Sequence, residues 1–185
     1  MDLEKLKKSI SMIAVGFVFT LVNINLKFGD TTVNVMPDFI GWLLYFLAFD
    51  GLGEYGKGKE YMKWAALPIM VMNIVQYAYT FINPEAELTI LNTVTNLCEV
   101  AYLFLLLGIV EMIAEDIGSG QTERIHTVRY LIVAAELFIL LFTIFMKKVG
   151  ISEAVVVMTV AIVLFIVMIL TMIALLKLRK EVKAL

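Results

Sequence analysis

The chain has 185 residues, of which 61% are hydrophobic and only 17% are charged, and its mean hydropathy is +0.91. Soluble domains contain roughly 45–50% apolar residues, so this chain has more apolar residues than a soluble core of its size can bury. The composition therefore indicates an integral protein of the cell membrane and excludes soluble enzymes and secreted disulfide scaffolds. A formal net charge of −2 offers no basic footprint for nucleic acid, and the single cysteine, Cys98, allows no internal disulfide.

Charge-poor runs long enough to cross roughly 30 Å of hydrocarbon recur along the chain. They predict an all-α integral membrane protein with six transmembrane helices in one domain, residues 1–185. The predicted spans lie near residues 6–24, 38–54, 64–83, 89–112, 129–147 and 154–177. The loops between them are too short for a separate soluble domain, so any function must come from the spans and their connections.

The 15 lysines and arginines fall unequally on the two faces that six alternating spans define. One face carries twelve of them: Lys5, Lys7, Lys8, Lys57, Lys59, Lys63, Arg124, Arg129, Lys177, Arg179, Lys180 and Lys183. The other face carries three, namely Lys27, Lys147 and Lys148. Because basic residues collect on the cytoplasmic side, this split predicts a multi-pass plasma-membrane protein with both termini in the cytoplasm.

The segment between the first two predicted spans changes to a period of two. Residues 23–28 and 31–36 alternate polar and apolar around Gly29-Asp30, which is the pattern of a short β-hairpin on the outer side. A two-residue loop pairs Ile24 with Val35, Asn25 with Asn34, Leu26 with Val33 and Lys27 with Thr32. An irregular loop with chance alternation is the alternative.

The hairpin leads directly into a short helix that begins at Pro37-Asp38. Proline suits a first helical turn, and a carboxylate there complements the helix dipole. A helix from 38 to about 53 is roughly 24 Å long, somewhat less than a full span, so its outer end would lie below the surface. The sequence thus predicts a pocket under the hairpin with Asn34 and Asp38 on its wall, or, alternatively, an Asp38 that only caps the helix.

Polar residues recur on one face of the third predicted span and on one face of the fourth. They are Asn73, Gln76 and Thr80 in the third span and Asn92, Asn96 and Glu99 in the fourth. Counted from the outer turn, the two stripes lie at matching depths, and hydrogen bonds between the helices would explain the amides. Glu99 is different, because a carboxylate near mid-membrane costs several kcal/mol unless it is protonated, hydrated or met by a cation.

The remaining acidic and nucleophilic groups give weaker signals. Glu136 lies in the fifth span and is a possible secondary binding residue, although it is also placed to reach Arg129 on the same face. Asp50, Glu54 and Glu111 fall near the cytoplasmic boundary and are expected to be solvated. His126 and Cys98 have no neighbouring residue in sequence that makes a metal or nucleophile–base pattern, so no metal, no cofactor and no catalytic residue is predicted.

The segment Val35-Met36-Pro37-Asp38-Phe39-Ile40-Gly41-Trp42-Leu43-Leu44, preceded by Asn23-Ile24-Asn25, carries a resemblance. It is similar to small multi-pass membrane proteins of Gram-positive bacteria that have an "IN…LPDFIGY" signature after their first span. Met36 and Trp42 stand where that signature has Leu and Tyr. This resemblance covers residues 20–55 and implies a bacterial membrane source but no assigned activity.

The layout of six spans, cytoplasmic termini and a hairpin-like first outer loop also resembles the substrate-binding S components of energy-coupling-factor transporters. The Ala-x-x-x-Ala docking pattern of that family is absent from residues 11–18.

Two functions remain open from the sequence. The first is a component that binds or transports a small polar or cationic solute in an outward-facing polar pocket. Its predicted ligand-binding residues are Asn34, Asp38, Asn73, Gln76, Asn96 and Glu99. The second is a non-transporting accessory or regulatory protein that binds another membrane protein or a second copy of itself within the bilayer. An enzyme is not expected, because catalysis would have to rest on carboxylates alone.

Overall fold

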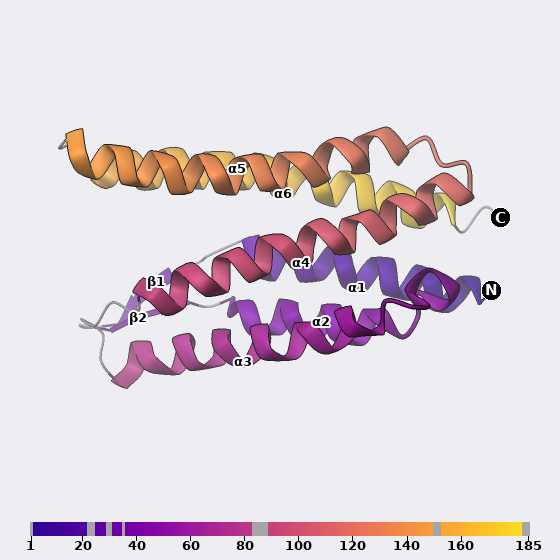
Figure 1. Ribbon diagram of the computed structural model, residues 1–185, viewed down its shortest axis with the longest axis horizontal. Coiled ribbons are helices and arrows are strands. Elements are labelled where there is room, and N and C mark those ends of the chain that lie inside the picture. The colour runs from indigo at the N-terminus through magenta and orange to yellow at the C-terminus, as the bar shows by residue number, and fades with distance from the viewer. Residues whose placement is uncertain are drawn as a thin grey trace.

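The computed structural model describes residues 2–21, 25–28, 31–34, 36–82, 89–149 and 153–182. Its elements in chain order are α1 (Leu3–Leu21), β1 (Asn25–Phe28), β2 (Thr31–Asn34), α2 (Asp38–Phe49), the 3₁₀ helix η1 (Gly53–Gly56), α3 (Glu60–Ile82), α4 (Thr89–Asp116), α5 (Thr122–Val149) and α6 (Glu153–Glu181). The long helices run side by side, with the strands at one end and both chain ends at the other (Figure 1). The protein is therefore a helical bundle in which the connections alternate between two ends.

Helix α1 lies at the centre of the packing, between α2 on one side and α6 on the other. Its buried apolar residues Leu6, Ile10, Ile13, Ala14 and Phe17 recur at spacings of three and four, which places them on one helical face. The second half of the bundle continues from α4 to α5 and from α5 back to α6. These contacts give one hydrophobic core that the six α-helices of the described chain share.

Strands β1 and β2 pair antiparallel immediately after α1. The register joins Asn25 with Asn34, Leu26 with Val33, Lys27 with Thr32, and Phe28 with Thr31. The first three pairs are those that the alternation in the sequence predicts, while the predicted pair of residues 24 and 35 lies outside the described residues. β2 contacts α3, so the paired strands lie beside the end of α3 that is distant from the chain termini (Figure 1).

Helix α2 is even shorter than expected, because its α-helical part ends at Phe49 and a turn leads into η1. Its 12 residues span roughly 18 Å, about half the length of the 23-residue α3 beside it. The Phe39 ring packs edge to face on Tyr77 of α3, with 5.7 Å between ring centroids. Since Tyr77 lies five residues before the end of α3, the first turn of α2 lies roughly 7 Å below that end.

The other helices extend past the predicted spans, chiefly at the end that holds the chain termini. α1 starts at Leu3 instead of 6, α3 at Glu60 instead of 64, α4 continues to Asp116, α5 starts at Thr122 instead of 129, and α6 continues to Glu181. The predicted bounds were set by charge, whereas backbone hydrogen bonding continues through charged turns. Among the described residues, two helical segments are long and apolar enough to cross a membrane, Leu91–Asp116 and Met158–Glu181.

Candidate functional site

The polar stripes of α3 and α4 meet through a partly buried hydrogen bond between Asn73 and Glu99. The Asn73 amide nitrogen donates to Glu99 Oε1 at 2.7 Å and to the Ile69 carbonyl, one turn earlier, at 2.9 Å. Asn73 is only 6% exposed, so its amide is held between the two helices. The sequence predicts that the two stripes lie at matching depths. The contact between Asn73 and Glu99, the members of the stripes farthest from the α3–α4 turn, confirms this.

A second bond between the same helices lies closer to the strand end. Gln76 Nε2 donates to the Thr95 hydroxyl at 2.9 Å, and that hydroxyl donates to the Leu91 carbonyl at 2.8 Å. Thr95 is a partner that the sequence reading missed. At 3.6 residues per turn it lies about 40° around α4 from Glu99, whereas Asn96 lies about 60° away on the opposite side. The spacing of four between Thr95 and Glu99 is the signal that could have identified this face.

Asn96 does not join that interface and lies instead along the groove between α4 and α5. This groove has a volume of about 590 Å³, and apart from Asn96 and Thr93 its walls are mainly apolar, with Leu97 and Phe104 on α4 and Leu137 on α5. Asn92, which the sequence places on the same stripe, is exposed. The structure therefore separates Asn96 from the other predicted binding residues on α3 and α4.

Asp38 lies in the first turn of α2, half-buried, at the level set by the contact between Phe39 and Tyr77. Pro37 precedes it at the N-cap position with no side-chain capping bond. Asn34 ends β2 opposite Asn25, and its side chain is not part of the description. Asp38 thus lies in the first turn of a short helix beside α3, at the end of that helix nearer the strands (Figure 1). Its place on the wall of a pocket under the hairpin stays a prediction.

A layer of aromatic rings lies between α1, α2 and α4. Trp42 and Tyr45 are fully buried on α2, and their ring centroids lie 5.1 and 6.1 Å from the centroid of Tyr102 on α4. Tyr45 also shares a 3.0 Å hydrogen bond with the Thr20 hydroxyl. Asp38 lies one turn before Trp42 on α2, and Glu99 lies about one turn before Tyr102 on α4, so the aromatic layer lies next to two predicted carboxylates that come from different helices.

Two polar atoms of this aromatic layer have no hydrogen-bond partner among the described residues. They are the Trp42 indole Nε1 and the Tyr102 hydroxyl, both buried. An unpaired buried donor is costly, by roughly 1–3 kcal/mol, so such groups usually meet water or a ligand. The aromatic layer thus has two buried polar groups that could form hydrogen bonds with a polar ligand.

An ionic cluster lies in the α4–α5 interface near the turn that joins the two helices. Glu111 accepts from Arg129 Nη1 at 3.0 Å and contacts His126 Nδ1 at 2.6 Å, and its side chain is only 18% exposed. The prediction that Glu111 is solvated is therefore wrong, because α5 brings two basic side chains back beside it after the turn. Arg129 also donates to the Phe104 carbonyl at 3.0 Å, and the side chain of Glu136 lies outside the described part of the structure.

Asp50, also expected to be solvated, remains exposed but pairs with Lys63 across the α2–α3 connection. In the same region, partial burial and the neighbouring carboxylates of Asp116 and Glu54 raise the pKa of the Tyr55 phenol. These residues belong to the end of α2, η1, the start of α3 and the end of α4, all at the end of the bundle that holds the chain termini. They form no part of the aromatic layer near Glu99.

The fold and site together define a helical protein with a polar cluster inside its α1–α4 half and, in the part of the chain that the structure describes, two helices long and apolar enough to cross a membrane. Comparison of the chain with protein-family models, with curated proteins and with solved structures gave no match.

Proposed function

We propose that the chain is an integral membrane protein with six spans and both termini on the cytoplasmic side. The apolar window of α6 supports this placement, because only 29% of it is buried inside the fold. α6 has three large apolar side chains that are more than half exposed, those of Met158, Ile162 and Phe165. Exposed apolar surface of this extent is costly in water and favourable against lipid.

The distribution of charge along the bundle supports the same orientation. The start of α1, the η1 connection, the α4–α5 turn and the end of α6 all lie at one end (Figure 1), and they carry nearly all the basic residues. Tyr61 and Trp64 at that end of α3 are each 61% exposed, as residues of an interfacial aromatic belt would be. The strands then lie on the outer side.

Within this placement, we propose that the protein binds or transports a small cationic solute at Asp38 and Glu99, entering from the outer side. The observation that carries the proposal is that Asp38 and Glu99 each lie about one helical turn before a ring of the aromatic layer, Trp42 and Tyr102 respectively, and that these two rings are 5.1 Å apart. Carboxylates supply the charge that an amine requires, and aromatic faces attract cations. Asn73 orients Glu99 through its amide, and the unsatisfied groups of Trp42 and Tyr102 would accommodate a polar atom of the solute.

A test of this proposal is native mass spectrometry of the protein extracted gently from its own membranes. We expect a reproducible small-mass adduct that is lost in Glu99→Gln and in Asp38→Asn. Glutamine at 99 still presents an oxygen to Asn73, so the α3–α4 contact should persist and stability should change by less than about 1 kcal/mol. Glu115→Gln removes a charge from an exposed position of the same helix and serves as the matched control. An adduct that persists in both site variants contradicts the proposal.

The alternative function is that of an accessory or regulatory protein that binds another membrane protein. The groove between α4 and α5 is the observation that favours it, because its mainly apolar walls carry a single amide side chain, that of Asn96. The hydrogen bonds between α3 and α4 would then serve only to join the helices. A stoichiometric protein partner without any small-mass adduct, lost in Asn96→Leu, would favour this function over solute binding.

A further inference from the structure

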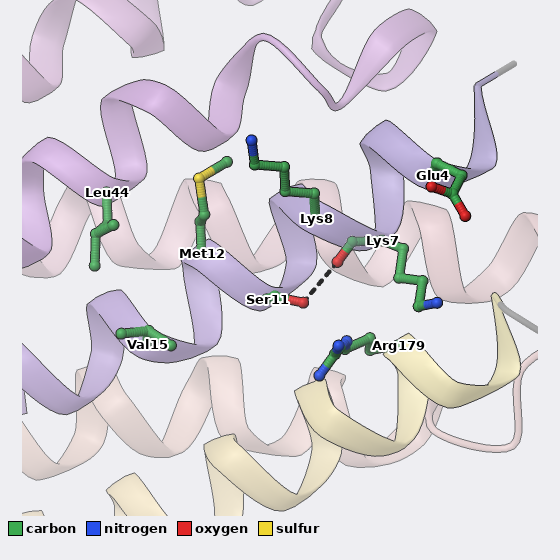
Figure 2. Close-up of a pocket in the computed structure, with 8 residues that line it drawn as sticks. All are labelled: Glu4, Lys7, Lys8, Ser11, Met12, Val15, Leu44 and Arg179. Carbon is green, nitrogen blue, oxygen red and sulfur yellow. Dashed lines mark hydrogen bonds between the residues drawn. The ribbon is translucent and has the colours of Figure 1, made fainter.

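The first half of α1 and the end of α6 line an open pocket of about 410 Å³ that is separate from the proposed solute site. Lys7 and Lys8 of α1 and Arg179 of α6 line it, so two helices that are distant in sequence contribute its basic groups (Figure 2). α1 and α6 pack against each other along this face. The pocket is therefore part of the packed bundle and not an isolated cluster on one helix.

The basic residues of this pocket form no ion pair within the described part of the chain. Ion pairs there join Lys5 to Asp2, Lys63 to Asp50, and His126 and Arg129 to Glu111, and none of them involves a basic residue of the pocket. Glu181, close to Arg179 in sequence, instead accepts hydrogen bonds from Ser119 and Gln121. One lining carboxylate, Glu4, opposes three cations, which leaves a net charge of 3 − 1 = +2.

The pocket changes from polar to apolar along the bundle. Its basic residues lie toward the chain termini, whereas Met12, Val15 and Leu44 line the part that lies toward the middle of the bundle (Figure 2). Val15 is 45% exposed, so this apolar wall is open to its surroundings. In the orientation proposed above, the basic part lies at the level of the inner headgroups and the apolar part lies beside the acyl chains.

We propose that this pocket binds an anionic phospholipid of the inner leaflet, a site that rests on the proposed membrane placement. The lipid phosphate lies between Lys7 and Arg179, and one acyl chain lies along Met12 and Val15. Lys8 points to the other side of α1 and adds to the positive charge of the pocket without facing the phosphate (Figure 2). Basic pockets between helices on the cytoplasmic side are suited to anionic headgroups. A zwitterionic headgroup is disfavoured, because it brings its own cation next to those of Lys7 and Arg179.

The test uses the purified full-length chain in detergent, titrated with dioleoyl phosphatidylglycerol and followed by native mass spectrometry. We expect one lipid to be retained, and its affinity to fall about thirtyfold in Lys7→Gln/Arg179→Gln, since each basic residue near an anionic headgroup contributes roughly fivefold. The matched control is Lys177→Gln/Lys180→Gln, which removes two exposed charges of α6 that do not line the pocket. We expect a change below about threefold in the control.

Three outcomes would overturn the proposal. Equal losses in both double variants would mean diffuse attraction to the basic end. Dioleoyl phosphatidylcholine bound as tightly as the glycerol lipid would mean no selection for negative charge. Inorganic phosphate that displaces the lipid at equal concentration would indicate a free-anion site instead.

Extraction of native membranes with alkaline carbonate separates this inference from the proposal on which it rests. Release of the chain into the soluble fraction overturns the membrane placement and the lipid site together. A chain that stays in the membrane but shows no selective lipid binding overturns the lipid site alone.

Discussion

Gly41→Ala is expected to destabilise the protein by about 2–3 kcal/mol, because α1 and α2 approach too closely at this position for a methyl group. A Cβ on residue 41 would lie 2.5 Å from Thr20 Cγ2 and 2.8 Å from the carbonyl oxygen of Gly16. The second of these atoms belongs to the backbone of α1 and cannot rotate away. The helices would have to separate, which also loosens the contact between Gly16 and the Tyr45 ring. The loss should appear as a lowered midpoint of thermal unfolding in detergent.

The matched control for this prediction is Gly120→Ala in the turn between α4 and α5. A Cβ there meets no heavy atom within 4 Å, and the backbone φ at this glycine is not positive. We expect a change in the free energy of unfolding of at most about 0.5 kcal/mol. If the two variants unfold at the same temperature, the close packing of α1 on α2 is contradicted.

The close approach at Gly41 also shows what the sequence leaves undetermined about the fold. Long apolar runs predict the helices themselves, because composition alone decides whether a segment can be buried in lipid or in a core. Which glycine meets which backbone depends on the rotation of two helices about their axes. α1 carries two small residues four apart at this contact, Gly16 and Thr20, but such a spacing does not say which residue of which helix will pack against it. The ends of the helices were also misplaced, since charged turns continue the backbone hydrogen-bond pattern.

The candidate site was predicted in part for a similar reason. Depth counted from a shared turn brings Asn73 and Glu99 to the same level, and their spacing from other polar residues identifies the facing sides. The predicted polar face of α4 included Asn96, because an amide side chain is more polar than that of threonine. In the structure it is Thr95 that faces α3. The aromatic layer was missed, since Trp42 and Tyr102 belong to α2 and α4, which are not consecutive in the chain, and no sequence spacing relates them.

Arg129→Met is expected to destabilise the protein by about 2 kcal/mol, because it leaves Glu111 with His126 as its remaining basic contact. The Arg129 side chain is 21% exposed, donates to the Phe104 carbonyl and holds its guanidinium 3.9 Å from the centre of the Phe104 ring. Gly108 makes room for it, since a Cβ there would lie 3.0 Å from the guanidinium carbon. Methionine keeps part of the packing but removes every hydrogen bond. Thermal unfolding at neutral pH measures the effect.

The double variant Glu111→Leu/Arg129→Met tests whether the loss comes from the charge that is left behind. Removing both partners takes away the uncompensated carboxylate, so we expect the double variant to recover at least half of the stability lost in Arg129→Met. Glu111 precedes the α4–α5 turn and Arg129 follows it, so pairing of the two residues requires that α5 fold back along α4 in the observed register. If the two single losses simply add in the double variant, the residues do not interact, and this register of α5 on α4 would have to be abandoned.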